Sequence, residues 1–210
     1  MTPLMAPLPR ERVTPAPPFQ VAGVDYAGPV TLTAVRGRGR SSIKGYIAVF
    51  VCFTTRAIHL ELVGDYSSEA FLAAFQRFSA RRGVPAVLYS DQGTTFIGAD
   101  RALRAQLRTA LDVGGPVARA LAADGTEWRF VPPSAPHFGG LWEAGVRSVK
   151  HHLRRVLGER LLSVEEFSTW LTRVEAWTLS PLTQDPGDLD VLSLGPTELS
   201  TIELTTPRES

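Results

Sequence analysis

"YIAVFVCFTTRAIHLELV", residues 46–63, decides the fold class because it holds two strand patterns joined by a short polar turn. Residues 46–53 form a continuous apolar run, as expected of a central strand. Residues 57–63 alternate instead, so that Ile58, Leu60 and Leu62 share one face of a strand. The polar residues between the two runs predict a hairpin.

Further elements are expected on both sides of this hairpin. Phenylalanines at helical spacing predict a helix over 67–82, with Ser67 as its N-cap and Gly83 just past its end. In chain order, the expected strands are 20–27, 46–53, 57–63, 85–90 and 127–131, and the expected helices are 67–82, about 99–111, about 141–157 and about 163–177. Three leading strands followed by alternating helices and strands predict an α/β fold with a mixed sheet.

The amino-acid composition limits the classes of protein to which the chain can belong. The chain has 210 residues, of which 44% are hydrophobic, so one substantial domain with a buried core is expected. Its formal net charge is +1, so any nucleic-acid site must be a local basic patch. A single cysteine, Cys52, excludes a disulfide framework and fits an intracellular protein. No apolar stretch approaches about 20 residues, so no membrane span is expected.

The two ends of the chain differ from its middle. Residues 1–19 contain six prolines and are expected to form an extended arm. The region 20–177 carries the strand and helix patterns of the core. The region 178–210 is rich in Ser, Thr, Pro, Asp and Leu, which is typical of a weakly ordered tail.

Three acidic residues stand out by position. Asp25 is expected at the end of the first strand, Asp91 follows a later strand, and Glu143 lies in the first turn of the expected 141–157 helix. Sites in open α/β sheets form at strand ends. Carboxylates brought together there repel one another, and a hard divalent cation such as Mg²⁺ or Mn²⁺ relieves that repulsion. Each residue also has an ordinary explanation, since Asp is common in turns and a helix dipole favours Glu in a first turn.

Four longer stretches resemble, in order, the integrase core of BEL/Pao-type LTR retrotransposons, which is similar to retroviral integrases. They are "FQVAGVDYAGPV", "KGYIAVFVCFTTRAIHLELV", "FLAAFQRFSARRGVPAVLYSDQGTTFIGAD" and "PPSAPHFGGLWEAGVRSVKHHLRR". The resemblance covers about residues 6–177. It implies a ribonuclease H-like fold, a mixed five-stranded sheet with helices on both faces. It also implies a catalytic triad of Asp25, Asp91 and Glu143.

The resemblance further implies a reaction and its partners. The three acids would hold two Mg²⁺ or Mn²⁺ ions once DNA is bound, and the reaction would be phosphoryl transfer on DNA. Water as nucleophile would trim the element's ends, and a DNA 3′-hydroxyl would join them to target DNA. Such integrases work as multimers, so a homo-oligomer acting in the nucleus, without a membrane, is expected.

The 141–157 helix carries a basic stripe beside its acid. Glu143, Arg147, Lys150 and Arg154 fall on one face at helical spacing. The adjacent face is apolar and is expected to pack on the sheet: Val146, Val149, Leu153 and Leu157. The stripe either holds DNA phosphates or is a solvated face with a Glu143–Arg147 ion pair worth about 0.3–0.5 kcal/mol. The resemblance favours phosphate contact.

Other DNA contacts are expected at His137, in a loop given freedom by Gly139 and Gly140, and at Thr94 and Thr95, which follow the second aspartate. Similar sequences usually carry Asn in place of Thr95. A short basic patch at 36–40 is either a phosphate contact or a soluble turn.

The sequence departs from a complete integrase at both ends. Four histidines and one cysteine do not make the N-terminal zinc domain of the family, and the pattern deteriorates after Trp177. We therefore expect a fragment of a polyprotein or a truncated copy. Two alternatives stay open: a non-catalytic nucleic-acid-binding remnant, and a nuclease of the same fold that hydrolyses DNA without joining ends.

Overall fold

The computed structural model describes residues 14–33, 42–113, 125–131, 136–158 and 160–178. The first part of the arm, the basic patch at 36–40, residues 114–124 and the tail from residue 179 lie outside the described residues. None of the described helices is both long and apolar enough to span a membrane.

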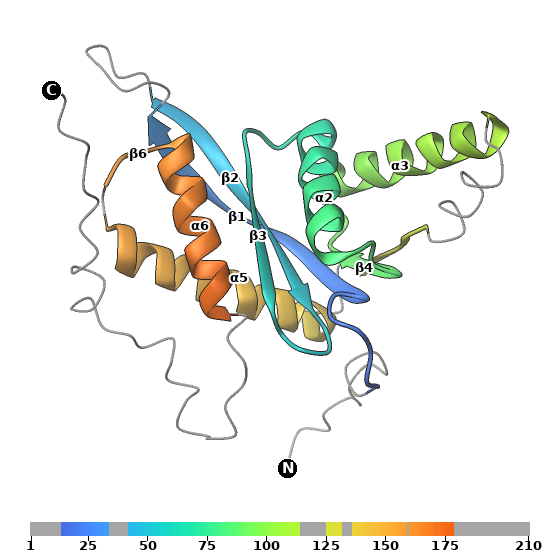
Figure 1. Cartoon of the computed structure of the whole chain (residues 1–210), viewed down its shortest axis with the longest axis horizontal. Helices are drawn as coiled ribbons and strands as arrows, with labels where there is room; N and C mark the ends of the chain where they lie inside the picture. Colours follow the sequence, from blue (N-terminus) through green and yellow to red (C-terminus); the bar gives the residue numbers. More distant parts are fainter. Residues whose placement is uncertain (1–13, 34–41, 114–124, 132–135, 159, 179–210) are drawn as a thin grey trace, which may run out of the picture.

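A mixed β-sheet forms the centre of the described structure, and its main strands run in the order β3-β2-β1-β4-β5 (Figure 1). β1 pairs antiparallel with β2 and parallel with β4, whereas β3 pairs antiparallel with β2. A short sixth strand, β6, pairs parallel with the end of β1. The strands are β1 (Val21–Thr33), β2 (Ser42–Cys52), β3 (Ile58–Val63), β4 (Val87–Ser90), β5 (Glu127–Phe130) and β6 (Leu162–Ser163).

Helices cover both faces of this sheet. One face packs against α2 (Ser68–Arg82) and α3 (Thr94–Val113) and the other against α5 (Pro136–Leu157) and α6 (Val164–Thr178) (Figure 1). Each face has its own hydrophobic cluster, and the side chains of β2 alternate between the two. Burial on both faces explains why β2 is a continuous apolar run. The structure confirms the expected α/β fold.

Several local expectations are confirmed. The two strands of 46–63 form the predicted hairpin. The Ser67 side chain accepts a hydrogen bond from the Ala70 N–H and caps α2, and Gly83 follows the helix with a positive φ of 89°. Cys52 is buried and accepts a hydrogen bond from the Phe19 N–H at 3.2 Å. Phe19, the last residue of the expected arm, is itself part of the core.

Several boundaries differ from the sequence predictions. β1 does not end near Asp25 but continues to Thr33, through a shift in register between Ala27 and Val30. A bulge of this kind allows a strand to pass a Gly-Pro pair that otherwise predicts its end. α3 begins at Thr94 rather than near residue 99, and β6 was not expected.

The start of α5 also differs from the prediction, and this difference matters most for the candidate site. Residues 136–140, expected to be part of a flexible loop, belong to the helix, which begins at Pro136. Proline suits the first helical position, because its missing N–H would have no partner there. Glu143 therefore lies about two turns into α5 and not in its first turn.

Candidate active site

Asp25 and Asp91 lie on neighbouring parallel strands. Gly23 of β1 pairs with Tyr89 of β4, and continuing that register by two residues places Asp25 beside Asp91. Asp25 sits inside β1, whereas Asp91 is the first residue after β4 ends at Ser90. Residues two apart in a strand point to the same face, so Asp25 shares the face of Gly23. The fold thus brings together two acids that are far apart in the sequence.

Glu143 is brought toward this pair by a close contact between α5 and the sheet. Trp142 is buried, and a β-carbon built on Gly23 would lie 2.3 Å from its Cε3 atom. On the helix, a β-carbon on Gly145 would lie 2.7 Å from Cγ2 of Val51, the residue that pairs with Gly23. Glycine on both sides allows α5 to approach β1 and β2 closely. Glu143 directly follows Trp142, the residue that covers Gly23.

The electrostatics of Asp25 reflect these neighbours. Burial raises the pKa of the Asp25 carboxyl, while the N–H of Tyr26, donating to its Oδ1 at 2.7 Å, lowers it. The negative charge of Asp91 raises this pKa further, and the positive charge of Lys150 lowers it. The negative charge of Glu143 also raises it, by the smallest amount. The three acids and one lysine therefore interact through space.

Asp91 is held by its own turn. Its Oδ1 accepts the N–H of Gly93 at 2.9 Å, in the turn that leads into α3. This bond fixes the side chain with one oxygen engaged, while Asp91 itself is exposed. The pair thus combines a half-buried and an exposed carboxylate.

The arrangement fits a divalent cation by its chemistry and only in part by its geometry. Carboxylate oxygens are the ligands that Mg²⁺ prefers, and burial, followed by the charges of Asp91 and Glu143, raises the pKa of Asp25. Within the described residues, however, no three His, Cys, Asp or Glu side chains lie close enough together to hold a metal ion. The register of β1 and β4 points Asp25 and Asp91 toward each other, and the charges of both Asp91 and Glu143 act on Asp25.

The position of Glu143 in α5 rules out the helix dipole as the reason for an acid at this residue. A helix dipole acts on carboxylates within the first turn, and α5 has no acidic residue there. Glu143 is exposed and separated from the helix start by about two turns. Helix-end electrostatics does not account for an acid at this place.

The predicted two faces of α5 are confirmed. Glu143, Arg147, Lys150 and Arg154 are all exposed. The predicted apolar face is buried against the sheet and α6: Val146, Val149, Leu153 and Leu157. The basic stripe therefore begins beside the acidic pair, where Lys150 already acts on the pKa of Asp25.

The remaining predicted contact residues divide into three cases. Thr94 is exposed at the start of α3. Thr95 is only 7% exposed, and its hydroxyl donates to the carbonyl of Tyr66 at 2.6 Å, so the structure gives it a partner within the protein. The backbone of His137 belongs to α5, but its side chain lies outside the described residues.

Sequence reasoning missed the residues that position the site. Gly23 and Gly145 set the approach of α5, and Tyr89 packs against Trp142 with ring centroids 6.4 Å apart. Arg129 of β5 donates to the Tyr89 hydroxyl at 2.9 Å. A glycine inside a strand pattern was the available signal, because it marks a close approach of another chain segment.

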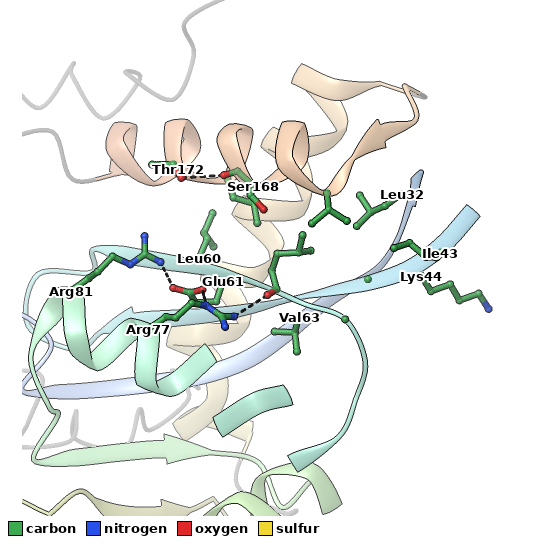
Figure 2. A pocket seen from close by; sticks show the side chains of 15 residues that line it. Leu32, Ile43, Lys44, Leu60, Glu61, Val63, Arg77, Arg81, Ser168 and Thr172 are labelled. Carbon is green, nitrogen blue, oxygen red and sulfur yellow. Dashed lines mark hydrogen bonds and ion pairs between the residues drawn. The ribbon is translucent and has the colours of Figure 1, made fainter. Parts of the chain in front are cut away.

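A second charged cluster, also missed, lies at the β3 edge of the described sheet. His59 is fully buried, and its ring nitrogens lie 3.0 Å from Glu61 and 3.0 Å from Glu175 of α6. Figure 2 shows Arg77 and Arg81 reaching Glu61 from α2, beside an open groove of about 640 Å³. The residues that line this groove include none of the three candidate catalytic acids. The cluster ties α2, β3 and α6 together.

No protein-family model matches the sequence, and no curated protein matches it either. Among solved structures, the chain is similar to the HTLV-2 integrase catalytic core domain in complex with magnesium, in its trimeric form. The TM-score is 0.50 at 15% identity, over 81% of this chain and 92% of that chain. It is also similar to a chain of the simian T-cell lymphotropic virus intasome in complex with PP2A regulatory subunit B56 gamma. There the TM-score is 0.51 at 14% identity, over 80% of this chain.

These likenesses show the fold: the chain has the α/β architecture of retroviral integrase catalytic cores. It spans about half of the similar chain in the intasome, whose coverage is 50%. The likeness is one of fold alone, so the class of protein and its activity are matters for proposal.

Proposed function

We propose that this chain is the catalytic core of a retroelement integrase of the BEL/Pao type, with Asp25, Asp91 and Glu143 as its catalytic acids. The observation that supports the proposal is the parallel pairing of β1 and β4, whose register ends at Gly23 and Tyr89, each two residues before one of the two aspartates. The contact between Gly23 and Trp142, which brings α5 to this pair, supports the inclusion of Glu143.

In the proposed site, Asp25 and Asp91 provide the first carboxylate oxygens for Mg²⁺ or Mn²⁺, and Glu143 adds another. When bound, such ions lower the pKa of an attacking hydroxyl and neutralise charge on the leaving oxygen. The half-buried Asp25 supplies a fixed negative charge, because the Tyr26 N–H orients its Oδ1. Asp91 is oriented in the same way by the Gly93 N–H. Both acids are thus preorganised by backbone donors.

The basic stripe of α5 supplies the DNA contacts in this proposal. Arg147, Lys150 and Arg154 are exposed along one helix face that starts at Glu143. Positive side chains at this spacing bind successive phosphates and fix the register of the strand on the acids. Thr94 extends the contact on the α3 side, His137 on the α5 side, and Thr95 acts through Tyr66. The reactions would be trimming of the element's DNA ends and their joining to target DNA, in a nuclear homo-oligomer.

One observation favours a second candidate, a DNA-binding remnant without catalysis. Within the described residues, no three potential ligands are gathered tightly enough to hold a metal ion. If the remnant is correct, the basic stripe of α5 still binds DNA with a strongly salt-dependent affinity. Metal binding therefore separates the two candidates.

The separating experiment is a calorimetric titration of Mn²⁺ into the whole chain, with and without a duplex that carries one element-like end. The catalytic proposal predicts binding that is strengthened by DNA and abolished in Asp25→Asn. A matched control, Glu165→Gln, changes an exposed acid on α6 and should leave Mn²⁺ binding unchanged. DNA binding by a chain that takes up no Mn²⁺ in either state would instead establish the remnant.

A further inference from the structure

Tyr66 is an exposed aromatic residue at a position that the chain holds firmly. It lies between β3, which ends at Val63, and α2, which begins at Ser68, and it is 51% exposed. Asp65 accepts the Ser67 N–H at 2.8 Å, and Ser67 in turn caps α2. The backbone around Tyr66 is therefore fixed on both sides although the side chain faces solvent.

The ring of Tyr66 is fixed as well. It packs on Tyr26 with centroids 4.5 Å apart and planes tilted by 39°, and it meets Tyr46 edge-on with centroids 4.6 Å apart. Both partners are strand residues of the sheet. A ring already held in this way loses little conformational freedom when it binds a further group. Half of the residue nevertheless stays open to solvent.

The segment that carries Tyr66 contacts the elements of both acids. Tyr26 directly follows Asp25 in β1, although consecutive strand residues point to opposite faces of the sheet. Thr95, which donates to the Tyr66 carbonyl at 2.6 Å, lies in the helix that follows Asp91. Burial raises the pKa of the Tyr66 hydroxyl, and the charges of Asp25 and Asp91 raise it further. The segment carrying Tyr66 is thus anchored to the elements that carry both acids.

We propose that Tyr66 is a stacking contact for an unpaired nucleobase of the DNA strand bound at Asp25 and Asp91. The inference rests on the proposed function and adds to it a binding position outside α5. Aromatic side chains bind nucleobases through their π-faces, and such stacking is tolerant of sequence. A rigid, half-exposed ring on a segment tied to β1 and α3 suits the frayed or overhanging end on which end trimming acts.

A packing role for Tyr66 within the protein is the competing explanation, because its ring also covers Tyr26. Two variants separate the roles. Tyr66→Phe keeps the ring, whereas Tyr66→Leu keeps apolar volume without a π-face. Stacking predicts that only the leucine variant loses DNA affinity. A packing role predicts equal DNA affinity for both variants at equal thermal stability.

The test measures the affinity of the whole chain, without metal, for a duplex with an unpaired overhang and for a blunt duplex, at one fixed salt concentration. We expect Tyr66→Leu to weaken overhang binding by about tenfold and to leave blunt binding unchanged. The control Val84→Ala changes another exposed apolar residue and should affect neither. Unchanged overhang binding by Tyr66→Leu would overturn the proposal.

A second measurement maps the contact directly. An overhang carrying 5-iodouracil is irradiated in complex with the wild-type chain, and the product is digested with trypsin. The proposal predicts a cross-link within residues 57–77, the peptide released by cleavage after Arg56 and Arg77, in which Tyr66 is the sole tyrosine. Cross-links confined to other peptides would contradict it.

The failure of this proposal can be told from the failure of the proposed function. If wild type binds and cleaves DNA but Tyr66→Leu does so equally, Tyr66 is excluded as a stacking contact while the proposed function stands. If wild type does not bind DNA, both fail.

Discussion

Trp142 rests on Gly23 so closely that a β-carbon on the glycine would lie 2.3 Å from the tryptophan Cε3 atom. The contact joins α5 to β1 two residues from Asp25 and one residue from Glu143. A distance under 3.0 Å to a fixed ring cannot be accommodated without movement of α5 or β1. This pair therefore sets where the third acid stands relative to the first two.

Gly23→Ala should both destabilise the chain and displace Glu143. We expect a loss of about 1–3 kcal/mol in the free energy of unfolding, the usual cost of overpacking a core. Urea unfolding measures the loss, and metal-dependent DNA cleavage measures the displacement. Gly64→Ala is the matched control, because a β-carbon there meets nothing within 4 Å. Equal stability of the two variants would refute the close contact.

The His59 cluster predicts a pH dependence of stability. Burial alone would lower the pKa of His59, but hydrogen bonds to Glu175 and Glu61 outweigh it and raise the pKa. The positive charge of Arg81 opposes that rise. Arg82 Nε lies 3.3 Å from Nδ1 and Arg81 Nη2 lies 3.4 Å from Nε2, both longer than the 3.0 Å to each carboxylate, so the two carboxylates dominate and the raised pKa favours the protonated ring.

Because this pKa is raised on folding, its stabilising contribution is complete below the unfolded value of about 6.5 and is lost as pH rises through the folded value. Urea unfolding from about pH 6 to about pH 9 should therefore show declining stability in wild type. His152 has a pKa lowered by burial and contributes the opposite slope. Subtracting the profile of His59→Gln isolates the cluster. A difference between the two profiles that does not vary with pH would rule out a protonated His59.

Neutralising the α5 stripe should weaken DNA binding evenly across sequences. Each of Arg147→Gln, Lys150→Gln and Arg154→Gln is expected to reduce the slope of log affinity against log salt by about 0.9, the value for one lost phosphate contact. Fluorescence anisotropy on a labelled duplex measures the slope. Arg101→Gln removes an exposed charge on α3, across the sheet from the stripe, and serves as control. Equal slopes for Arg147→Gln and Arg101→Gln would place the DNA elsewhere.

Much of the fold could be predicted because the deciding patterns are local. The apolar run of β2 and the phenylalanine spacing of α2 each fix one element by its own residues. The end of β1 was predicted wrongly, because a Gly-Pro pair ends most strands and the sequence does not show the bulge that carries β1 past it. The start of α5 was missed for a related reason, since Pro136 followed by two glycines is typical of a loop.

The site was predictable only as a set of residue types. The sequence showed that Asp25 and Asp91 belong to strand patterns, but their adjacency comes from the pairing of β1 with β4 across more than sixty residues. The Gly23–Trp142 contact and the His59–Glu175 pair join segments still further apart. Such partners depend on tertiary packing, which no local pattern encodes. The burial of Thr95 was hidden in the same way.

The most direct test of the central claim is the rate of Mn²⁺-dependent cleavage of a labelled duplex by wild type and by Asp91→Asn. Asn keeps the size of the side chain and its hydrogen-bonding oxygen but removes the charge. The account predicts cleavage by wild type and a loss of at least about a hundredfold in the variant, because metal-stabilised charge is worth several kcal/mol. Glu165→Gln should cleave like wild type. Equal cleavage by wild type and Asp91→Asn would contradict the catalytic assignment of the Asp25–Asp91 pair.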